Sequence, residues 1–101
     1  MNNFKIPENH IPIEAFHVGQ YISDELKARG IKPKDFAPLI NLTPAFFNAL
    51  LKGNENLTAE IAYKLEKILK IKAEIWLRLQ CQYEIDLLRI KYGEKQNTID
   101  A

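Results

Sequence analysis

The segment at residues 42–53, LTPAFFNALLKG, constrains the fold more than any other stretch of this chain. Thr43 is a good helix N-cap, because its hydroxyl accepts a hydrogen bond from a free N–H of the first turn. Pro44 follows at the first helical position, where a missing N–H costs nothing, and Gly53 stands where the chain must leave the helix with positive φ. One apolar face at helical spacing is formed by Phe47, Leu50 and Leu51. The segment therefore predicts a short helix with one buried face.

The preceding residues, KPKDFAPLIN, predict a second short helix directly before it. This helix begins at Pro33 and ends before Asn41, a residue type that tolerates the left-handed backbone conformation. Pro38 removes one backbone hydrogen bond and should kink or shorten the helix. The side chains expected to face inward are Phe36, Leu39 and Ile40. Two short helices joined by a tight turn match the helix-turn-helix motif, whose second helix enters DNA.

Two more helices are predicted on either side of this pair. In residues 18–29 an apolar stripe recurs every four residues, and Gly30 ends the helix. A helix over residues 59–70 is capped by Thr58, and Glu60 in its first turn favours the positive helix end. Lysines fall on the outer face of this helix and are typical of a solvated surface.

The longest predicted helix covers residues 73–92 and is unusually apolar. It needs more packing partners than four small helices supply, so we expect either a second subunit related by a two-fold axis or cover from the N-terminal arm. An aromatic stripe at helical spacing fits a core as well as an interface between subunits. The residues assigned to the dimer interface are Trp76, Gln80, Tyr83 and Leu87.

The two ends of the chain differ from this helical body. Prolines rule out a continuous helix over residues 1–16, so we expect an extended arm lying on the body or on a second subunit, with a partly ordered tail as the alternative. Residues 93–101 are polar and predict a flexible tail. Residues 17–92 form the folded part. The predicted fold class is all-α, a five-helix repressor-like helix-turn-helix domain with an extended N-terminal arm.

Composition excludes several function classes. The length of 101 residues fits one domain. A net charge of +1 gives weak support for nucleic-acid binding, although a small domain can concentrate its cations on one face. The single Cys81 excludes an internal disulfide and a cysteine zinc cluster, and His10 and His17 lack partners at metal-ligand spacing. His17 is expected instead to help start the first helix. We find no catalytic, cofactor-binding, membrane-spanning or secretion pattern, so an enzyme is not expected.

Residues 17–83 resemble the XRE-type helix-turn-helix proteins, and within them the HigA-like antitoxins of bacterial toxin–antitoxin modules. HVGQYISDELKARGI is similar to the family's opening helix, in which Glu25 and Leu26 match the usual pair, and LTAEIAYKLEKILKI is similar to its fourth helix. IWLRLQCQYEID resembles a distinctive signature of the family, Trp-Leu-x-Leu-Gln-x-x-Tyr. That signature is carried here by Trp76, Leu77, Leu79, Gln80 and Tyr83.

The resemblance implies a cytoplasmic homodimer that binds a palindromic operator in its own promoter. It also implies an antitoxin that holds a small ribonuclease toxin in an inactive complex. The residues predicted to contact DNA are Lys32, Lys34, Thr43, Pro44, Ala45, Asn48, Ala49, Lys52, Asn54 and Asn56. No cofactor or metal is expected.

The predicted DNA-reading helix departs from the family pattern. Relatives usually place Ser, Arg and Thr on its exposed face, followed by Asn-Gly-Lys-Arg. In this chain those places are followed by Lys-Gly-Asn-Glu and hold Pro44, Ala45, Phe46, Asn48 and Ala49. Only Asn48 offers the paired donor and acceptor that read a base edge, and alanines at most touch thymine methyl groups. Glu55, where a basic residue is usual, repels phosphate. The alternative function is therefore a protein-interaction module that kept the fold and lost specific DNA binding.

Overall fold

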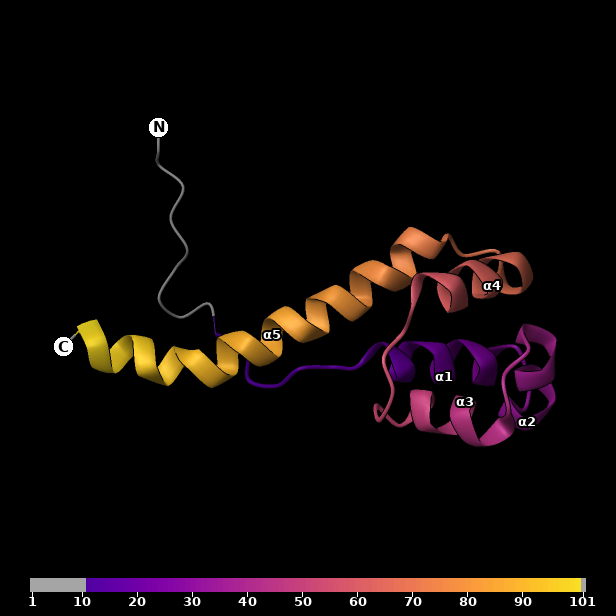
Figure 1. Ribbon diagram of the computed structural model, residues 1–101, viewed down its shortest axis with the longest axis horizontal. Coiled ribbons are helices and arrows are strands. Elements are labelled where there is room, and N and C mark those ends of the chain that lie inside the picture. The colour runs from indigo at the N-terminus through magenta and orange to yellow at the C-terminus, as the bar shows by residue number, and fades with distance from the viewer. Residues whose placement is uncertain (1–10, 101) are drawn as a thin grey trace.

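The computed structural model describes residues 11–100, with side chains described as far as Gly93. All regular structure in these residues is helical, as predicted. The elements are α1 (Val18–Ala28), α2 (Pro33–Phe36), the 3-10 turn η1 (Ala37–Ile40), α3 (Pro44–Leu51), α4 (Ala59–Leu69) and α5 (Ala73–Asp100). Figure 1 shows the short helices gathered at one end, while α5 starts beside α4 and runs away from them.

Side-chain caps set the starts of α3 and α4. Thr43 accepts a hydrogen bond from the N–H of Phe46 at 3.1 Å, and Thr58 accepts one from the N–H of Ile61 at 3.2 Å, so both predicted caps are confirmed. Asn41 ends the second helical segment with φ of 59°, also as predicted. These local signals were readable from sequence because each involves residues within four positions of one another.

One hydrophobic core lies between the short helices and the start of α5. Phe36 and Phe47 pack with ring centroids 5.6 Å apart and join the two helices of the motif. Trp76, which is 3% exposed, brings the beginning of α5 into the same core. The other fully buried large side chains come from α1, η1, α3 and α4, namely Val18, Ile22, Leu26, Ile40, Leu50, Leu65 and Leu69.

The helix predicted over residues 33–40 is divided. Pro38 lies within η1, where the tighter winding replaces the α-helix, so the predicted shortening is confirmed. The prediction that Leu39 faces inward is wrong, because this side chain is 62% exposed. A 3-10 turn places residues three apart on one side. Ala37 and Ile40 therefore share the buried side, and Leu39 points outward.

Helix α5 continues to Asp100, beyond the predicted end at Tyr92. Gly93 weakens a helix by only about 1 kcal/mol relative to alanine. The residues that follow it include Glu94, Lys95 and Gln96, which are good helix formers, and no proline stops the helix. One uninterrupted helix thus runs from Ala73 to Asp100, and the flexibility expected of residues 93–101 stays a prediction.

The described part of the N-terminal arm, residues 11–16, is not helical, as predicted, whereas the rest of the predicted arm lies outside the described residues. Ile11 packs on α5 at Gly93, where an added Cβ would lie 2.6 Å from the Ile11 Cδ1 atom. The arm therefore covers part of α5, which was one of the two expected solutions. Ile13 is 99% exposed, so the cover is incomplete.

Candidate nucleic-acid interface

The exposed face of α3 carries mostly small side chains. Pro44, Ala45 and Asn48 are exposed, and Ala49 is half-buried. The opposite face is fixed in the core by Phe47 and by the fully buried Leu50. This amphipathic arrangement holds α3 against the body and leaves one side available to an external partner.

A hollow of about 390 Å³ lies between the beginnings of α2 and α3. It is lined by Lys32, Pro33, Lys34, Pro44 and Asn48. Four of the residues predicted to contact DNA are therefore brought together, from segments about ten residues apart in sequence. Two lysines, both exposed, give this end of the surface its positive charge.

The remaining predicted DNA contacts lie at Thr43 and beyond the C-terminal end of α3. The hydroxyl of Thr43 is engaged in capping. Lys52 and Asn54 are exposed, and the Asn54 N–H donates to the carbonyl of Ala49 at 2.8 Å. Asn56 has a structural contact, because its Oδ1 accepts a hydrogen bond from Gln80 at 3.3 Å. At this end of α3, the side chains of Lys52 and Asn54 are therefore less engaged within the chain than the side chain of Asn56.

Gln80 ties α5 to the loop that follows α3. It is 5% exposed, its Oε1 accepts from the N–H of Leu57 at 3.1 Å, and its Nε2 donates to Glu84 at 2.6 Å. A side chain this buried needs such partners. Sequence reasoning placed Gln80 at a dimer interface and missed this role, since no pattern in the chain pairs it with Leu57, 23 residues away.

Of the other residues assigned to the dimer interface, Trp76 is a core residue of the single chain and has almost no surface to offer a partner. Tyr83 is half-buried, and Leu87 is 43% exposed. Leu87 belongs to a run of exposed apolar side chains in the later part of α5, together with Ile85, Leu88 and Tyr92, and Ile75 is exposed near the start of the helix.

His17 connects α1 to α5. Its Nδ1 accepts a hydrogen bond from the N–H of Gly19 at 2.8 Å, and its ring meets the edge of Tyr83 with centroids 4.7 Å apart. Burial lowers the pKa of His17 below 6.5, although the backbone of Glu55 and the carboxylate of Glu84 oppose this shift. Because Nδ1 acts as an acceptor, the cap requires a neutral imidazole. The prediction that His17 helps to start the first helix is confirmed by this cap.

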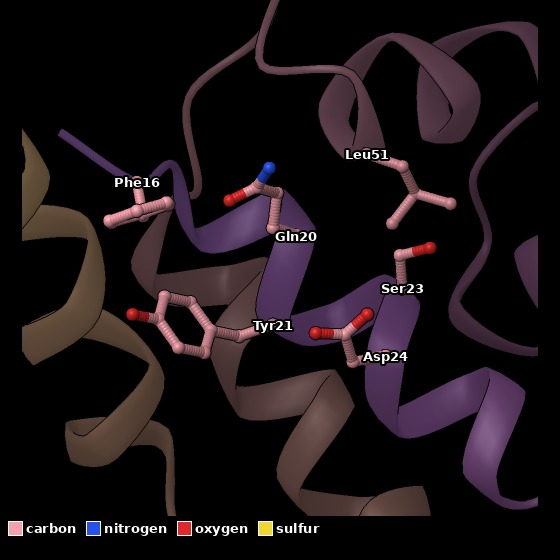
Figure 2. A pocket seen from close by; sticks show the side chains of 6 residues that line it. All are labelled: Phe16, Gln20, Tyr21, Ser23, Asp24 and Leu51. Carbon is pink, nitrogen blue, oxygen red and sulfur yellow. The ribbon is translucent and has the colours of Figure 1, made fainter. Parts of the chain in front are cut away.

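A second hollow, of about 410 Å³, lies on the α1 side of α3 (Figure 2). Figure 2 shows that most of its side chains come from α1, with Phe16 before that helix and Leu51 from the end of α3. The α1 residues are Gln20, Tyr21, Ser23 and Asp24. The carboxylate of Asp24 makes this hollow unsuited to phosphate. Sequence reasoning did not identify it, because its residues are ordinary surface residues until α1 and α3 pack together.

Within residues 11–93 no three His, Cys, Asp or Glu side chains form a group able to hold a metal ion, and Cys81 is exposed. In the part of the chain that the structure describes, each helix is too short or too polar to cross a bilayer.

Known proteins resemble the chain in sequence and in structure, although no family model matches it. It is 30% identical over 80 residues to Virulence-associated protein A' of Dichelobacter nodosus, which covers 78% of this chain and 70% of that protein. An addiction module antidote protein of the HigA family from Coxiella burnetii has a TM-score of 0.76 and 26% identity, covering 85% of this chain and 95% of that one. The antitoxin HigA of Pseudomonas aeruginosa, solved with the higBA promoter, has a TM-score of 0.74 and 22% identity. The match covers 81% of this chain and 90% of that one. The predicted fold is confirmed.

Proposed function

The chain belongs to the XRE-type helix-turn-helix family, among its HigA-like antitoxins, and on this basis we propose that it is a sequence-specific, non-enzymatic repressor of its own operon. In this role α3 enters the major groove of a palindromic operator. The related HigA of Pseudomonas aeruginosa, whose structure includes the higBA promoter, supports the proposal. We propose also that the protein neutralises a partner ribonuclease toxin and acts in the cytoplasm.

The observation that carries the DNA-binding proposal is the distribution of cations around α3. Lys32 and Lys34 flank one end of its exposed face, and Lys52 stands at the other. Lysine contacts to phosphate on both sides of a groove position a recognition helix, and contacts from that helix to bases provide specificity. A net charge of +1 is compatible with this arrangement, because the three cations are concentrated where the phosphates would lie.

The second part of the proposal is a homodimer formed through the far half of α5. Ile85, Leu87 and Leu88 are exposed there, and Ile13 of the arm is exposed as well. An exposed apolar surface of this kind marks an interaction site. A two-fold dimer would present two copies of α3 to the two halves of a palindrome. This proposed interface shares Leu87, the most exposed member, with the set assigned from the sequence.

A fluorescence-anisotropy titration against the protein's own upstream DNA tests the DNA-binding proposal. We expect binding that persists over scrambled DNA and weakens steeply between low and high salt, because counterions are released from the phosphates. Lys34→Ala should weaken binding to both DNAs and reduce the salt dependence, while Asn48→Ala should weaken binding to the operator alone. Absence of operator preference at either salt concentration would reject the proposal.

The alternative function, a protein-interaction module, is favoured by one observation. The described surface of α3 between Pro44 and Leu51 contains no charged side chain. If the chain has lost DNA binding, the same face would contact a protein. The two functions differ in the titration, since a protein-interaction module would give no salt-dependent binding to upstream DNA.

A further inference from the structure

The exposed face of α3 has one group able to hydrogen-bond a base edge in two places. The side-chain amide of Asn48 offers a donor and an acceptor, is exposed, and has no hydrogen-bond partner among the described residues. Guanine is usually read by arginine or lysine, adenine by asparagine or glutamine, and thymine through contact with its methyl group. α3 contains neither arginine nor lysine. Its side-chain chemistry therefore favours A·T over G·C base pairs.

The hollow next to Asn48 adds independent evidence about the partner. Pro33 and Pro44 form two of its walls, and a proline has no backbone N–H. An anion held at a helix start needs such N–H groups, so these walls suit an apolar group, while Lys32 and Lys34 remain for phosphates at the rim. At about 390 Å³ the hollow exceeds the size of a methyl group. Ala45 continues the small apolar surface from Pro44 along α3.

We propose that this surface reads an A·T-rich half-site, with a thymine C5 methyl group in the hollow between Pro33 and Pro44 and an adjacent adenine bound by Asn48. The amide nitrogen of Asn48 donates to adenine N7, and its oxygen accepts from the N6 amino group. Lys32 and Lys34 contact the flanking phosphates. The inference rests on the proposed DNA-binding function and deepens it by naming the bases.

The first test is selection of binding sites from a random duplex library with the full-length protein. We expect selected half-sites with A·T pairs at their centre. Replacing a contacted thymidine by deoxyuridine removes only the methyl group and should weaken binding about fourfold for each buried methyl. Replacing the contacted adenine by 7-deazaadenine removes the N7 acceptor and should weaken binding about tenfold.

Two variants assign these effects to residues. Asn48→Ala is at an exposed position and leaves the core intact, and its binding should no longer respond to 7-deazaadenine. Ala45→Arg introduces a bidentate donor and should shift the selected sites toward guanine. Lys34→Ala is the matched control, which should weaken binding equally for thymidine-containing and deoxyuridine-containing DNA.

The outcomes separate the inference from the function on which it rests. Salt-dependent binding to selected sites that are G·C-rich, or that do not respond to deoxyuridine, would overturn the inference and leave the repressor function standing. Failure to select any site would overturn both. A third outcome is that A·T pairs are enriched equally by Asn48→Ala and that neither base analogue changes binding. This would indicate readout of DNA shape and would also overturn the inference.

Discussion

At Gly19 helix α1 lies against the backbone of α3, and replacing this glycine by alanine should destabilise the protein. A Cβ built at Gly19 would contact the carbonyl oxygen of Leu50 and would lie 2.7 Å from the carbonyl oxygen of Leu51. Both contacts are with backbone atoms at the end of α3. Because backbone cannot rotate away as a side chain can, either α1 or α3 must shift.

The expected magnitude follows from two opposing terms. Alanine in a helix is favoured over glycine by at most about 1 kcal/mol. Overpacking costs typically about 1–3 kcal/mol, and contacts with rigid backbone place Gly19→Ala near the upper limit. We therefore expect a net loss of about 2 kcal/mol in the free energy of unfolding. For a domain of this size that loss lowers Tm by about 10 °C.

Thermal unfolding followed by circular dichroism measures this effect, with Gly93→Ala as the matched control. At Gly93 the added Cβ would meet the Cδ1 atom of Ile11, the end of a flexible side chain in the arm, so it can be displaced. We expect Gly93→Ala to change Tm by less than about 3 °C. If Gly19→Ala were equally well tolerated, the close approach of α1 to the end of α3 would be refuted.

Three further predictions concern a helix cap, a buried histidine and the exposed face of α5. Thr43→Ala should destabilise the protein by about 1 kcal/mol in urea unfolding and Thr43→Ser by much less, because serine retains the hydroxyl that caps α3; equal losses would contradict the cap. Because the pKa of His17 is lowered by folding, the unfolded chain binds a proton more readily than the folded one. The contribution of His17 to the free energy of unfolding should therefore be complete above pH 6.5 and should decrease as the pH falls from there toward the folded-state pKa. The drop in Tm between pH 7.5 and 5.5 should be smaller in His17→Asn, and an equal drop would assign it to other groups. Leu88→Glu should shift sedimentation toward the monomer without changing helix content, and an unchanged dimer would exclude this face of α5 as the interface.

Features that depend on neighbouring residues could be predicted from the order of the amino acids. Thr43, Pro44 and Gly53 mark the limits of α3, and the apolar spacing identifies its buried face. Such signals are legible because caps, turns and helical faces arise from interactions within about four residues. The choice of Asn48 as a base-reading group also came from sequence, since only the chemistry of the side chain was needed, and it remains a prediction.

Tertiary structure alone decided how the separate segments meet. It joined Lys32 and Lys34 to Pro44 and Asn48 around one hollow, and it directed Gln80 inward to Leu57. No periodicity reveals these pairings, because burial and long-range hydrogen bonds depend on which helices pack together after each has formed. Local chemistry specified the helices and their faces, whereas packing between distant segments determined which of those faces became surface, core or hollow.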